Sequence, residues 1–204
     1  MYEYHPVTPE RLADLARFSE ARGKFRYCSC MRWRLASAAY KRSTQESRIA
    51  ALASLVAQDI PVGVLAYRDG EPIAWVSVAP RETYAALERF KALPRADDFP
   101  VWSVVCFFVD RHERGQGLTL GLLQAAVAFA ISQGAEIVEG YPVEPGPRLY
   151  TYMGSPTTFL RAGFQEIAQP TEGRPIMRYY ATGKATGKRD QEEQDIQASW
   201  WPYD

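Results

Sequence analysis

The sequence predicts an α/β domain in which helices flank a β-sheet, and three observations lead to this class. Helical and strand periodicities alternate along the chain. Two β-rich runs flank Asp69-Gly70, a dipeptide typical of a tight hairpin turn. Residues 101–109 form a nearly unbroken apolar run, which is typical of a strand buried on both faces. The 204 residues fit one domain, which we place at residues 1–182, followed by a polar tail at 183–204 that ends in Trp200-Trp201.

Helices are expected where apolar residues recur every three or four positions. These segments are residues 8–20, 44–58, 82–93 and 117–133, and a short helix from Ser155-Pro156 to Gly163. Strands are expected at residues 62–67, 72–78, 101–109, 136–143, 164–167 and 175–180. We expect the last two to be antiparallel, around the turn Thr171-Glu172-Gly173. Residues 25–35 are dense in aromatics and arginines, and their structure is ambiguous.

Composition narrows the function classes. The chain carries 24 Lys and Arg against 24 Asp and Glu, so no global positive field gathers nucleic acid or anionic lipid. No apolar run approaches the roughly 18–20 residues that cross a bilayer, and the N-terminus does not resemble a signal peptide. Three cysteines and two histidines favour reduced thiols and no zinc site. We therefore expect a cytoplasmic protein that uses no metal, no nucleic acid and no membrane.

Cys28-Ser29-Cys30, followed by Arg32 and Arg34, allows two interpretations. It is a reactive thiol pair or half a metal site, or its small thiols fill space in a packed segment, which we favour. The arginines of this segment alternate with aromatic residues, a pattern that also occurs in RNA-binding surfaces. We interpret them instead as facing a substrate or the solvent.

The segment between the apolar run 101–109 and the helix 117–133 has the features of a phosphate site. Two glycines in Arg114-Gly115-Gln116-Gly117 precede the helix, where the first amides have no intrahelical acceptor and the positive end of the dipole points outward. A strand followed by such a turn and a helix N-terminus is a binding site for phosphate groups. Arg114 adds a permanent positive charge. The alternative is that the glycines only relieve a tight turn.

This segment resembles motif A of the Gcn5-related N-acetyltransferases, the GNAT superfamily, whose pattern is Gln/Arg-x-x-Gly-x-Gly/Ala at the same junction. The match is Arg114-Gly115-Gln116-Gly117-Leu118-Thr119, with Thr119 in place of the usual small residue. The run from Phe159 to Gly163-Phe164 resembles the end of motif B, and the order of elements over residues 1–182 is similar as well. The resemblance implies a mixed, mostly antiparallel sheet that is splayed open and flanked by helices.

The resemblance also implies a co-substrate, acetyl-CoA, held in the splay between the strand that ends at Val109 and the strand that starts at Glu136. The pyrophosphate then lies on the amides of Gly115, Gly117, Leu118 and Thr119. The backbone of Phe107, Phe108 and Val109 pairs with the pantetheine arm as an added strand does. An amine of the acceptor attacks the thioester directly. The acceptor is a small-molecule or peptide amine.

The residues that move protons are less well determined by the sequence. Many relatives place a tyrosine near the CoA sulfur where this chain has Phe159, which cannot donate a proton. Tyr150 or Tyr152 from the preceding loop is then the acid, or the thiolate leaves unassisted. Glu139 and Glu82 are the candidate bases, and the alternative for each is an ordinary solvated or capping glutamate.

The leading hypothesis is an N-acetyltransferase. The alternative is a catalytically weak acyl-CoA-binding or regulatory module of the same fold. Trp200-Trp201 at the end of the polar tail makes a homodimer a further expectation, if the pair docks on a second subunit.

Overall fold

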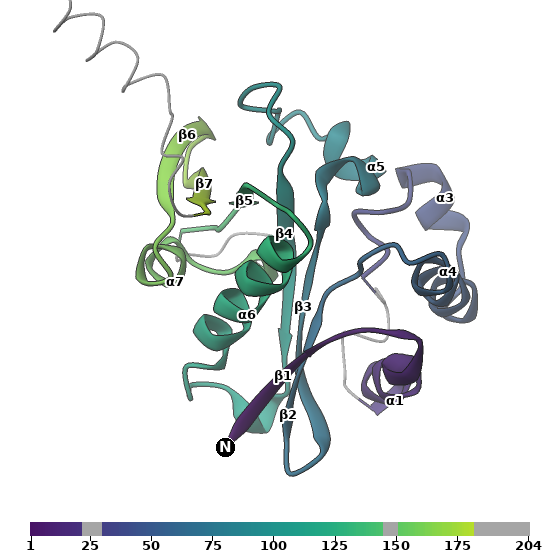
Figure 1. Cartoon of the computed structure of the whole chain (residues 1–204). Coiled ribbons are helices and arrows are strands. Elements are labelled where there is room, and N and C mark those ends of the chain that lie inside the picture. Colours follow the sequence, from purple (N-terminus) through teal and green to yellow (C-terminus); the bar gives the residue numbers. More distant parts are fainter. Residues whose placement is uncertain (22–29, 145–150, 182–204) are drawn as a thin grey trace, which may run out of the picture.

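The computed structural model describes residues 1–21, 30–144 and 151–181, and its centre is a seven-stranded sheet (Figure 1). The spatial order is β1-β2-β3-β4-β5-β7-β6. Only β4 and β5 are parallel; the other neighbours are antiparallel. The strands are β1 (Tyr2–Pro6), β2 (Val64–Arg68), β3 (Glu71–Pro80), β4 (Trp102–Val109), β5 (Ile137–Gly140), β6 (Gln165–Thr171) and β7 (Arg174–Tyr180).

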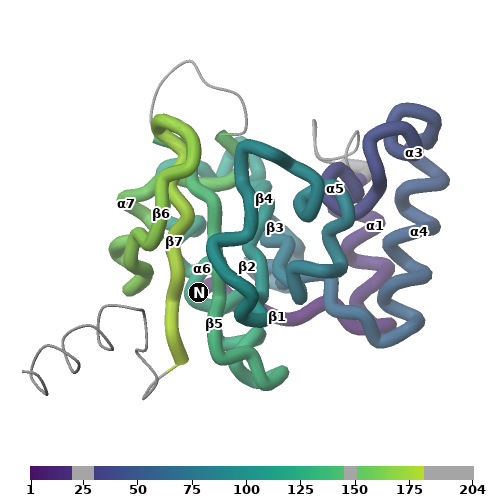
Figure 2. The backbone as a smooth tube through the Cα atoms, turned by 90° about the horizontal axis from the view of Figure 1, so that it is seen from above, coloured from purple at the N-terminus to yellow at the C-terminus, as the bar shows by residue number. Residues whose placement is uncertain are grey.

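Helices cover both faces of this sheet. The long helix α6 and the short helix α7 lie on one face, and α1, α3 and α4 gather on the other side of the molecule (Figures 1 and 2). The α-helices are α1 (Leu12–Ala21), α3 (Ser37–Arg42), α4 (Gln45–Ala57), α5 (Ala85–Glu88), α6 (Leu118–Ser132) and α7 (Pro156–Arg161). Short 3-10 turns are η1 (Pro9–Arg11), η2 (Arg81–Thr83), η3 (Arg111–Glu113) and η4 (Thr151–Met153).

Local signals placed most elements correctly. Thr44 caps α4 in a reciprocal capping box with Ser47, and Ser155 caps α7. Asp69 and Gly70 both have positive φ, which is the backbone that a two-residue hairpin turn requires. The expected hairpins β2–β3 and β6–β7, the strand at 101–109 and the helix at 117–133 are all confirmed.

Four segments differ from the prediction. Residues 82–93 were expected to form one helix but form only η2, the four-residue α5 and turns. The helix is interrupted because the backbone of Tyr84 is not helical and because the amide of Ala86 donates to Trp33 O. The predicted strand 136–143 ends at Gly140. Strand β1 and helix α3 were not predicted: β1 is short and ends in a proline, and α3 is a single short helix next to the ambiguous segment. The predicted tail at 183–204 lies outside the described residues.

The alternation of side chains along β3 and β4 divides the core in two. Val76, Val78, Val104 and their neighbours face α6, whereas Trp75 and the side chains beside it face α1 and α4. Both faces of these central strands are largely buried, which explains why β4 is apolar at every position except Ser103.

The parallel pair β4–β5 is paired over only three positions, Trp102 with Val138, Ser103 with Glu139 and Val104 with Gly140. Beyond Val104 the strand β4 continues to Val109, whereas β5 has ended. No described strand pairs with this edge of residues 105–109. We call this opening the fork; its closed end is at Trp102 and its open end is at Val109. The fork confirms the splayed sheet that the resemblance implied.

Candidate functional site

A β-bulge marks the point where the fork opens. Ser77 on β3 pairs with Cys106, and the next residue, Val78, pairs with Val104, so Val105 is the extra residue. Val105 and Cys106 therefore both pack on the side of the sheet away from α6. The bulge kinks β4 where its backbone groups lose their β5 partner, and the free edge runs from here to Val109.

The free edge leads directly into the predicted phosphate loop, residues 110–117. Gly115 and Gly117 have φ of +79° and +77°, and Gly117 is the N-cap of α6. A Cβ atom built on either glycine meets no atom within 4 Å, so the space beside the loop is open. Within the described residues, none of the amides of residues 115–119 donates a backbone hydrogen bond. These unpaired donors and the helix dipole form a site for an anion.

The predicted cofactor residues fall into an exposed group and a packed group. Arg114, Gly115, Gln116 and Gly117 are all exposed. The Arg114 Nε donates to Val109 O at 3.2 Å, so this guanidinium lies at the end of the free edge. The other residues expected to bind the co-substrate with their backbone have packed side chains; these are Phe107, Phe108, Val109, Leu118 and Thr119. The structure thus brings the loop and the free edge together.

Phe159 is buried at the fork and has no exposed surface. Its ring makes edge contacts with Phe107, centroids 6.2 Å apart, and with Phe164, 4.9 Å apart. A Cβ on Gly140 would approach the Phe159 Cε1 to 2.0 Å, so the ring fills the place that a side chain on the last residue of β5 would take. Phe159 therefore props β4 and β5 apart from the α7 side.

Glu139, predicted as a candidate base, is held by three donors in the sheet interior. Its Oε1 accepts hydrogen bonds from Arg81 Nη1 at 2.9 Å and from Tyr141 Oη at 2.6 Å. Its Oε2 accepts from Arg178 Nε at 2.8 Å, and its side chain is 1% exposed. A carboxylate held between two guanidinium groups is the shared partner of both buried positive charges. Glu139 is thus the centre of a buried ionic network, which favours a structural role. Its role as a base stays a prediction.

The network joins four parts of the chain at the closed end of the fork. Arg178 on β7 also makes two bonds to Asp97, at 2.6 and 2.9 Å, and these lower the pKa of the Asp97 carboxyl. Arg81 also donates to Glu88 at 2.8 Å. Burial, and then the charge of Glu139, raise the pKa of the Tyr141 phenol well above its ordinary value, so it stays protonated and donates to Glu139. The network fixes β5 against β7, β3 and the loop at 97.

Glu82, the other candidate base, lies apart from the open fork. It is exposed in η2, two residues after Pro80, which pairs with Trp102 at the closed end. Among the described residues, no side chain bonds to Glu82. The fold therefore does not bring Glu82 to the free edge of β4.

Tyr152, the candidate acid, lies in a turn that packs against β4 at the fork. In this turn, η4, Met153 joins the same core cluster as Val105. A Cβ on Gly154 would lie 3.2 Å from the ring of Phe107. Tyr152 itself is 36% exposed. Tyr152 is thus a partly exposed side chain beside the splay, while the alternative acid, Tyr150, lies outside the described residues.

Sequence reasoning missed the arginines of the buried network. Arg178 lies within the strand run Pro175-Ile176-Met177-Arg178, and Arg81 follows the apolar strand β3. An arginine inside or at the end of an apolar strand signals a buried ion pair, but its partner cannot be found from spacing alone.

The two described cysteines pack among apolar side chains, as the favoured interpretation of this segment expected for Cys30. Cys30 is buried, and its Sγ accepts a hydrogen bond from Trp75 Nε1 at 2.6 Å. Cys106 is a half-buried free thiol on β4. Cys28 lies outside the described residues.

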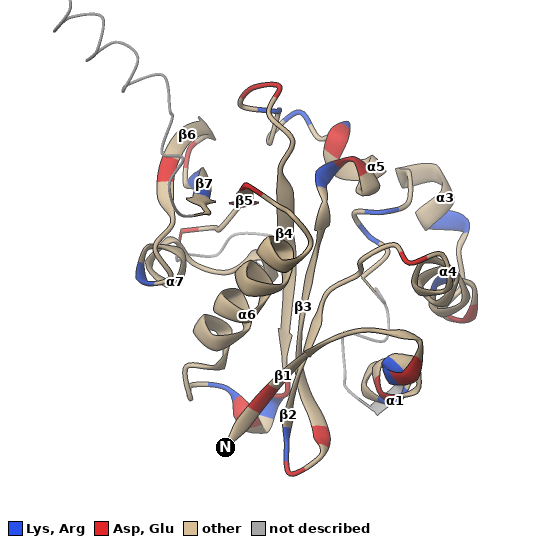
Figure 3. Cartoon of the chain, in the orientation of Figure 1, with Lys and Arg blue, Asp and Glu red and all other residues tan. Residues whose placement is uncertain are grey.

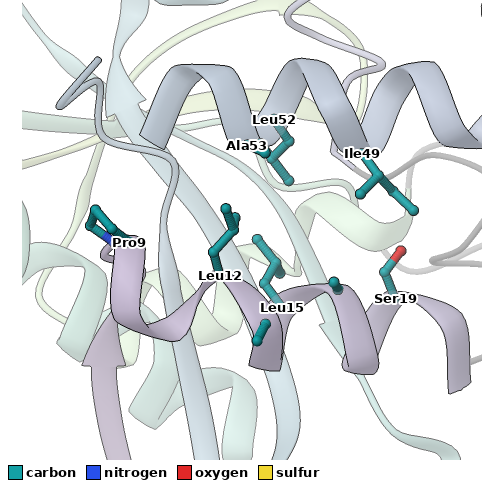
Figure 4. A pocket seen from close by; sticks show the side chains of 9 residues that line it. Pro9, Leu12, Leu15, Ser19, Ile49, Leu52 and Ala53 are labelled. Carbon is teal, nitrogen blue, oxygen red and sulfur yellow. The ribbon is translucent and has the colours of Figure 1, made fainter. Parts of the chain in front are cut away.

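An apolar cavity of about 410 Å³ lies between α1 and α4, lined by Leu12 and Leu15 on one side and by Ile49 and Leu52 on the other (Figure 4). None of the described side chains that line this cavity is ionisable. The cavity therefore offers no acid or base to a reaction. In the described ranges, no three His, Cys, Asp or Glu side chains group as metal ligands would. None of the helices in the described parts of the chain is long and apolar enough to cross a membrane.

Comparison with protein-family models gives a match over residues 28–151, to the model described as the acetyltransferase (GNAT) family. No curated protein sequence matches the chain.

Solved structures share the fold at low sequence identity. The PaiA N-acetyltransferase of Thermoplasma acidophilum, in complex with coenzyme A, is 12% identical with a TM-score of 0.52, over 89% of this chain and 99% of that one. The aminoglycoside acetyltransferase AAC(6')-Ib, in complex with coenzyme A and kanamycin, is 15% identical with a TM-score of 0.53, over 88% and 95%. A Drosophila melanogaster polyamine N-acetyltransferase, which forms N-acetylagmatine, is 13% identical with a TM-score of 0.51, over 89% and 100%.

The contacts of Glu139 predict that Glu139→Gln acts mainly on stability. Removing the charge leaves Arg81 and Arg178 without their shared buried partner, and breaking a buried pair in this way costs about 3 kcal/mol or more. We expect urea unfolding to show a loss of this size in the free energy of unfolding.

Glu82→Gln is the matched control, because it makes the same chemical change at an exposed site and should alter the free energy of unfolding by less than about 0.5 kcal/mol. If the Glu139→Gln variant is as stable as the wild type but has no turnover, Glu139 acts as the base.

Proposed function

Because this chain belongs to the acetyltransferase (GNAT) family, whose model matches residues 28–151, we propose that it transfers the acetyl group of acetyl-CoA to a primary amine of its acceptor by direct attack. Membership confirms the resemblance that Arg114-Gly115-Gln116-Gly117 indicated, and the shared fold confirms the predicted architecture. The chain is accordingly an N-acetyltransferase, and acetyl-CoA is the co-substrate typical of its family. The acceptor and the chemical steps are the proposal.

The observation that carries the proposal is the continuity of two sets of unpaired backbone groups. The free edge of β4 ends at Val109, and the amides of residues 115–119 follow after one turn. A diphosphate on these amides and an extended amide-bearing arm along the free edge fit the shape of CoA. The arm would add to β4 as a strand adds to a sheet edge. Such an arrangement directs the thioester toward the bulge at Val105.

In the proposed reaction the nitrogen lone pair of the amine attacks the thioester carbonyl carbon. The new C–N bond forms and the C–S bond breaks, the electron pair leaves with the sulfur, and the amine loses one proton. The protein supplies orientation and backbone donors near the bulge for the carbonyl oxygen. A nearby acid can protonate the thiolate, and water or a carboxylate can accept the amine proton.

We assign the acid to Tyr152 and leave Glu139 out of the chemistry. Tyr152 is accessible and lies on the turn packed against β4, whereas Glu139 is buried and bonded to two arginines. Glu82 remains a candidate for selecting cationic acceptors at the surface, because it is exposed and unpaired among the described residues. Water in the fork is then the first acceptor of the amine proton.

A small-molecule amine is the acceptor class that we propose. The neighbours with printed acceptors or products involve kanamycin and N-acetylagmatine, which are small molecules of the kind expected here. A peptide amine is the alternative, and the assay below separates the two.

A catalytically weak acyl-CoA-binding module is the second candidate. Two observations favour it. The residue at the usual tyrosine position, Phe159, is buried and has no hydroxyl proton to donate, and Glu139 is bound within the network. This candidate predicts CoA binding without turnover.

Release of free CoA thiol from acetyl-CoA tests the function over a panel of polyamines, aminoglycosides, amino acids and peptides with free amines. We expect turnover that depends on a small amine. CoA binding by calorimetry with no turnover on any amine would support the module instead. Absence of CoA binding would contradict both candidates.

Gly117→Ala tests the loop. Its φ of +77° makes any side chain cost about 1 kcal/mol, but the open space leaves no clash within the protein. The added methyl group would lie among the amides that hold the diphosphate. We expect CoA affinity to fall by about tenfold to a hundredfold, the loss of one or two bonds to a charged group, as measured by calorimetry.

Gly134→Ala is the matched control for this change. Gly134 follows the other end of α6, has φ of +87° and also has open space around it. It should show the same cost in unfolding free energy with unchanged CoA affinity. Equal CoA affinity in both variants would argue against the loop as the diphosphate site.

Tyr152→Phe tests the acid. If Tyr152 protonates the departing sulfur, the turnover number should fall by about a hundredfold or more, the usual contribution of general acid catalysis. CoA affinity should stay close to that of the wild type, because the aromatic ring is kept. Unchanged turnover would mean that the thiolate leaves without help from this residue.

A further inference from the structure

The N-terminal edge of the sheet contacts the phosphate loop at two points. Tyr2 on β1 and Arg68 on β2 are cross-strand partners. The Tyr2 Oη donates to Gln116 Oε1 at 2.6 Å. The Arg68 guanidinium makes two bonds to the Glu113 carboxylate, Nη1 to Oε2 at 2.8 Å and Nη2 to Oε1 at 2.6 Å. One pair of residues thus holds both ends of the loop segment 113–116.

Glu113 places a negative charge at the start of the glycine-containing part of the loop. It immediately precedes Arg114 and the two glycines, and its side chain is only 5% exposed. A buried carboxylate without a partner is costly, and its charge would repel a diphosphate bound beside it. Among the described side chains, Arg68 is the basic group that pairs with Glu113.

The charges of the loop do not favour an anion without Arg68. Residues 110–117 contain two acids, Asp110 and Glu113, and two arginines, Arg111 and Arg114. Figure 3 shows these opposite charges side by side in the loop before α6, next to the ends of β1 and β2. Arg68, on another strand, adds a third arginine to this group and pairs with one of its two acids, Glu113.

We propose that Tyr2 and Arg68 form a clamp that prepares the loop for the diphosphate of acetyl-CoA. Arg68 neutralises Glu113 and fixes it in a bidentate pair. Tyr2 holds the side chain of Gln116, so the amides on both sides of it stay oriented. Both are positioning residues, because they act through Glu113 and Gln116. This inference rests on the proposed use of acetyl-CoA.

The test is a charge cycle measured as CoA affinity by calorimetry, with Arg68→Gln, Glu113→Gln and the double variant. Arg68→Gln leaves Glu113 charged, and its repulsion of the diphosphate should weaken CoA binding roughly fivefold to tenfold at low salt. The loss should shrink as ionic strength rises. The double variant removes both charges and should bind CoA within about twofold of Glu113→Gln alone, a rescue that a general loss of structure would not produce.

Two further variants sharpen the cycle. Arg68→Lys keeps the charge without the bidentate geometry, so it should retain most of the affinity if neutralisation is the main effect. Arg17→Gln removes one positive charge from a surface pair on α1, Arg17 with Asp14, and should leave CoA affinity unchanged. Equal losses in Arg17→Gln and Arg68→Gln would assign the effect to net charge and overturn the clamp.

Tyr2→Phe removes only the bond to Gln116 and should weaken CoA binding about threefold to tenfold, the contribution of one hydrogen bond. An Arg68→Gln variant with wild-type affinity, or a double variant no better than Arg68→Gln, overturns the inference. If Arg68→Gln does not fold by circular dichroism, the double variant decides: folded protein with more than tenfold weaker binding overturns the clamp. A wild-type chain that does not bind CoA overturns the proposed function itself.

Discussion

The structure depends on one constraint: the parallel strands β4 and β5 pair over only three positions. Two parallel strands normally stay paired along their length, but here pairing stops at Val104 and Gly140. Backbone donors and acceptors beyond this point must find partners elsewhere, because unpaired buried groups are costly. A sheet that parts in this way has a built-in place for an extended molecule with amide groups, and the loop that follows β4 adds the site for its anionic end.

Several groups keep the fork open. The bulge at Val105 kinks β4, and the ring of Phe159 fills the space that a side chain at Gly140 would occupy. The network around Glu139 fixes the closed end by joining β5 to β3, β7 and the loop at Asp97. Apolar packing on one face and ion pairs at the closed end thus both stabilise the fork.

This arrangement also explains why the candidate residues differ in role. Glu139, a buried carboxylate at the closed end, pairs with two guanidinium groups of the scaffold. Tyr152, which is partly exposed on the turn packed against β4, is the acid of the proposed reaction. The edge formed by β1 and β2 contributes at the opposite end, where Tyr2 and Arg68 reach the phosphate loop.

The sequence by itself determined what short-range patterns encode. The apolar pattern predicted β4 and α6, Asp69-Gly70 predicted the hairpin, and the two glycines predicted the turn between β4 and α6, because each depends on neighbours in the chain. Tertiary structure alone decided the surroundings of Glu139, whose partners Arg81 and Arg178 are 58 and 39 residues away. It also decided the burial of Phe159 and the contacts of Tyr2 and Arg68 with the loop. An ion pair or a packed ring depends on which strands become neighbours, and side-chain spacing in one segment carries no information about a partner in another.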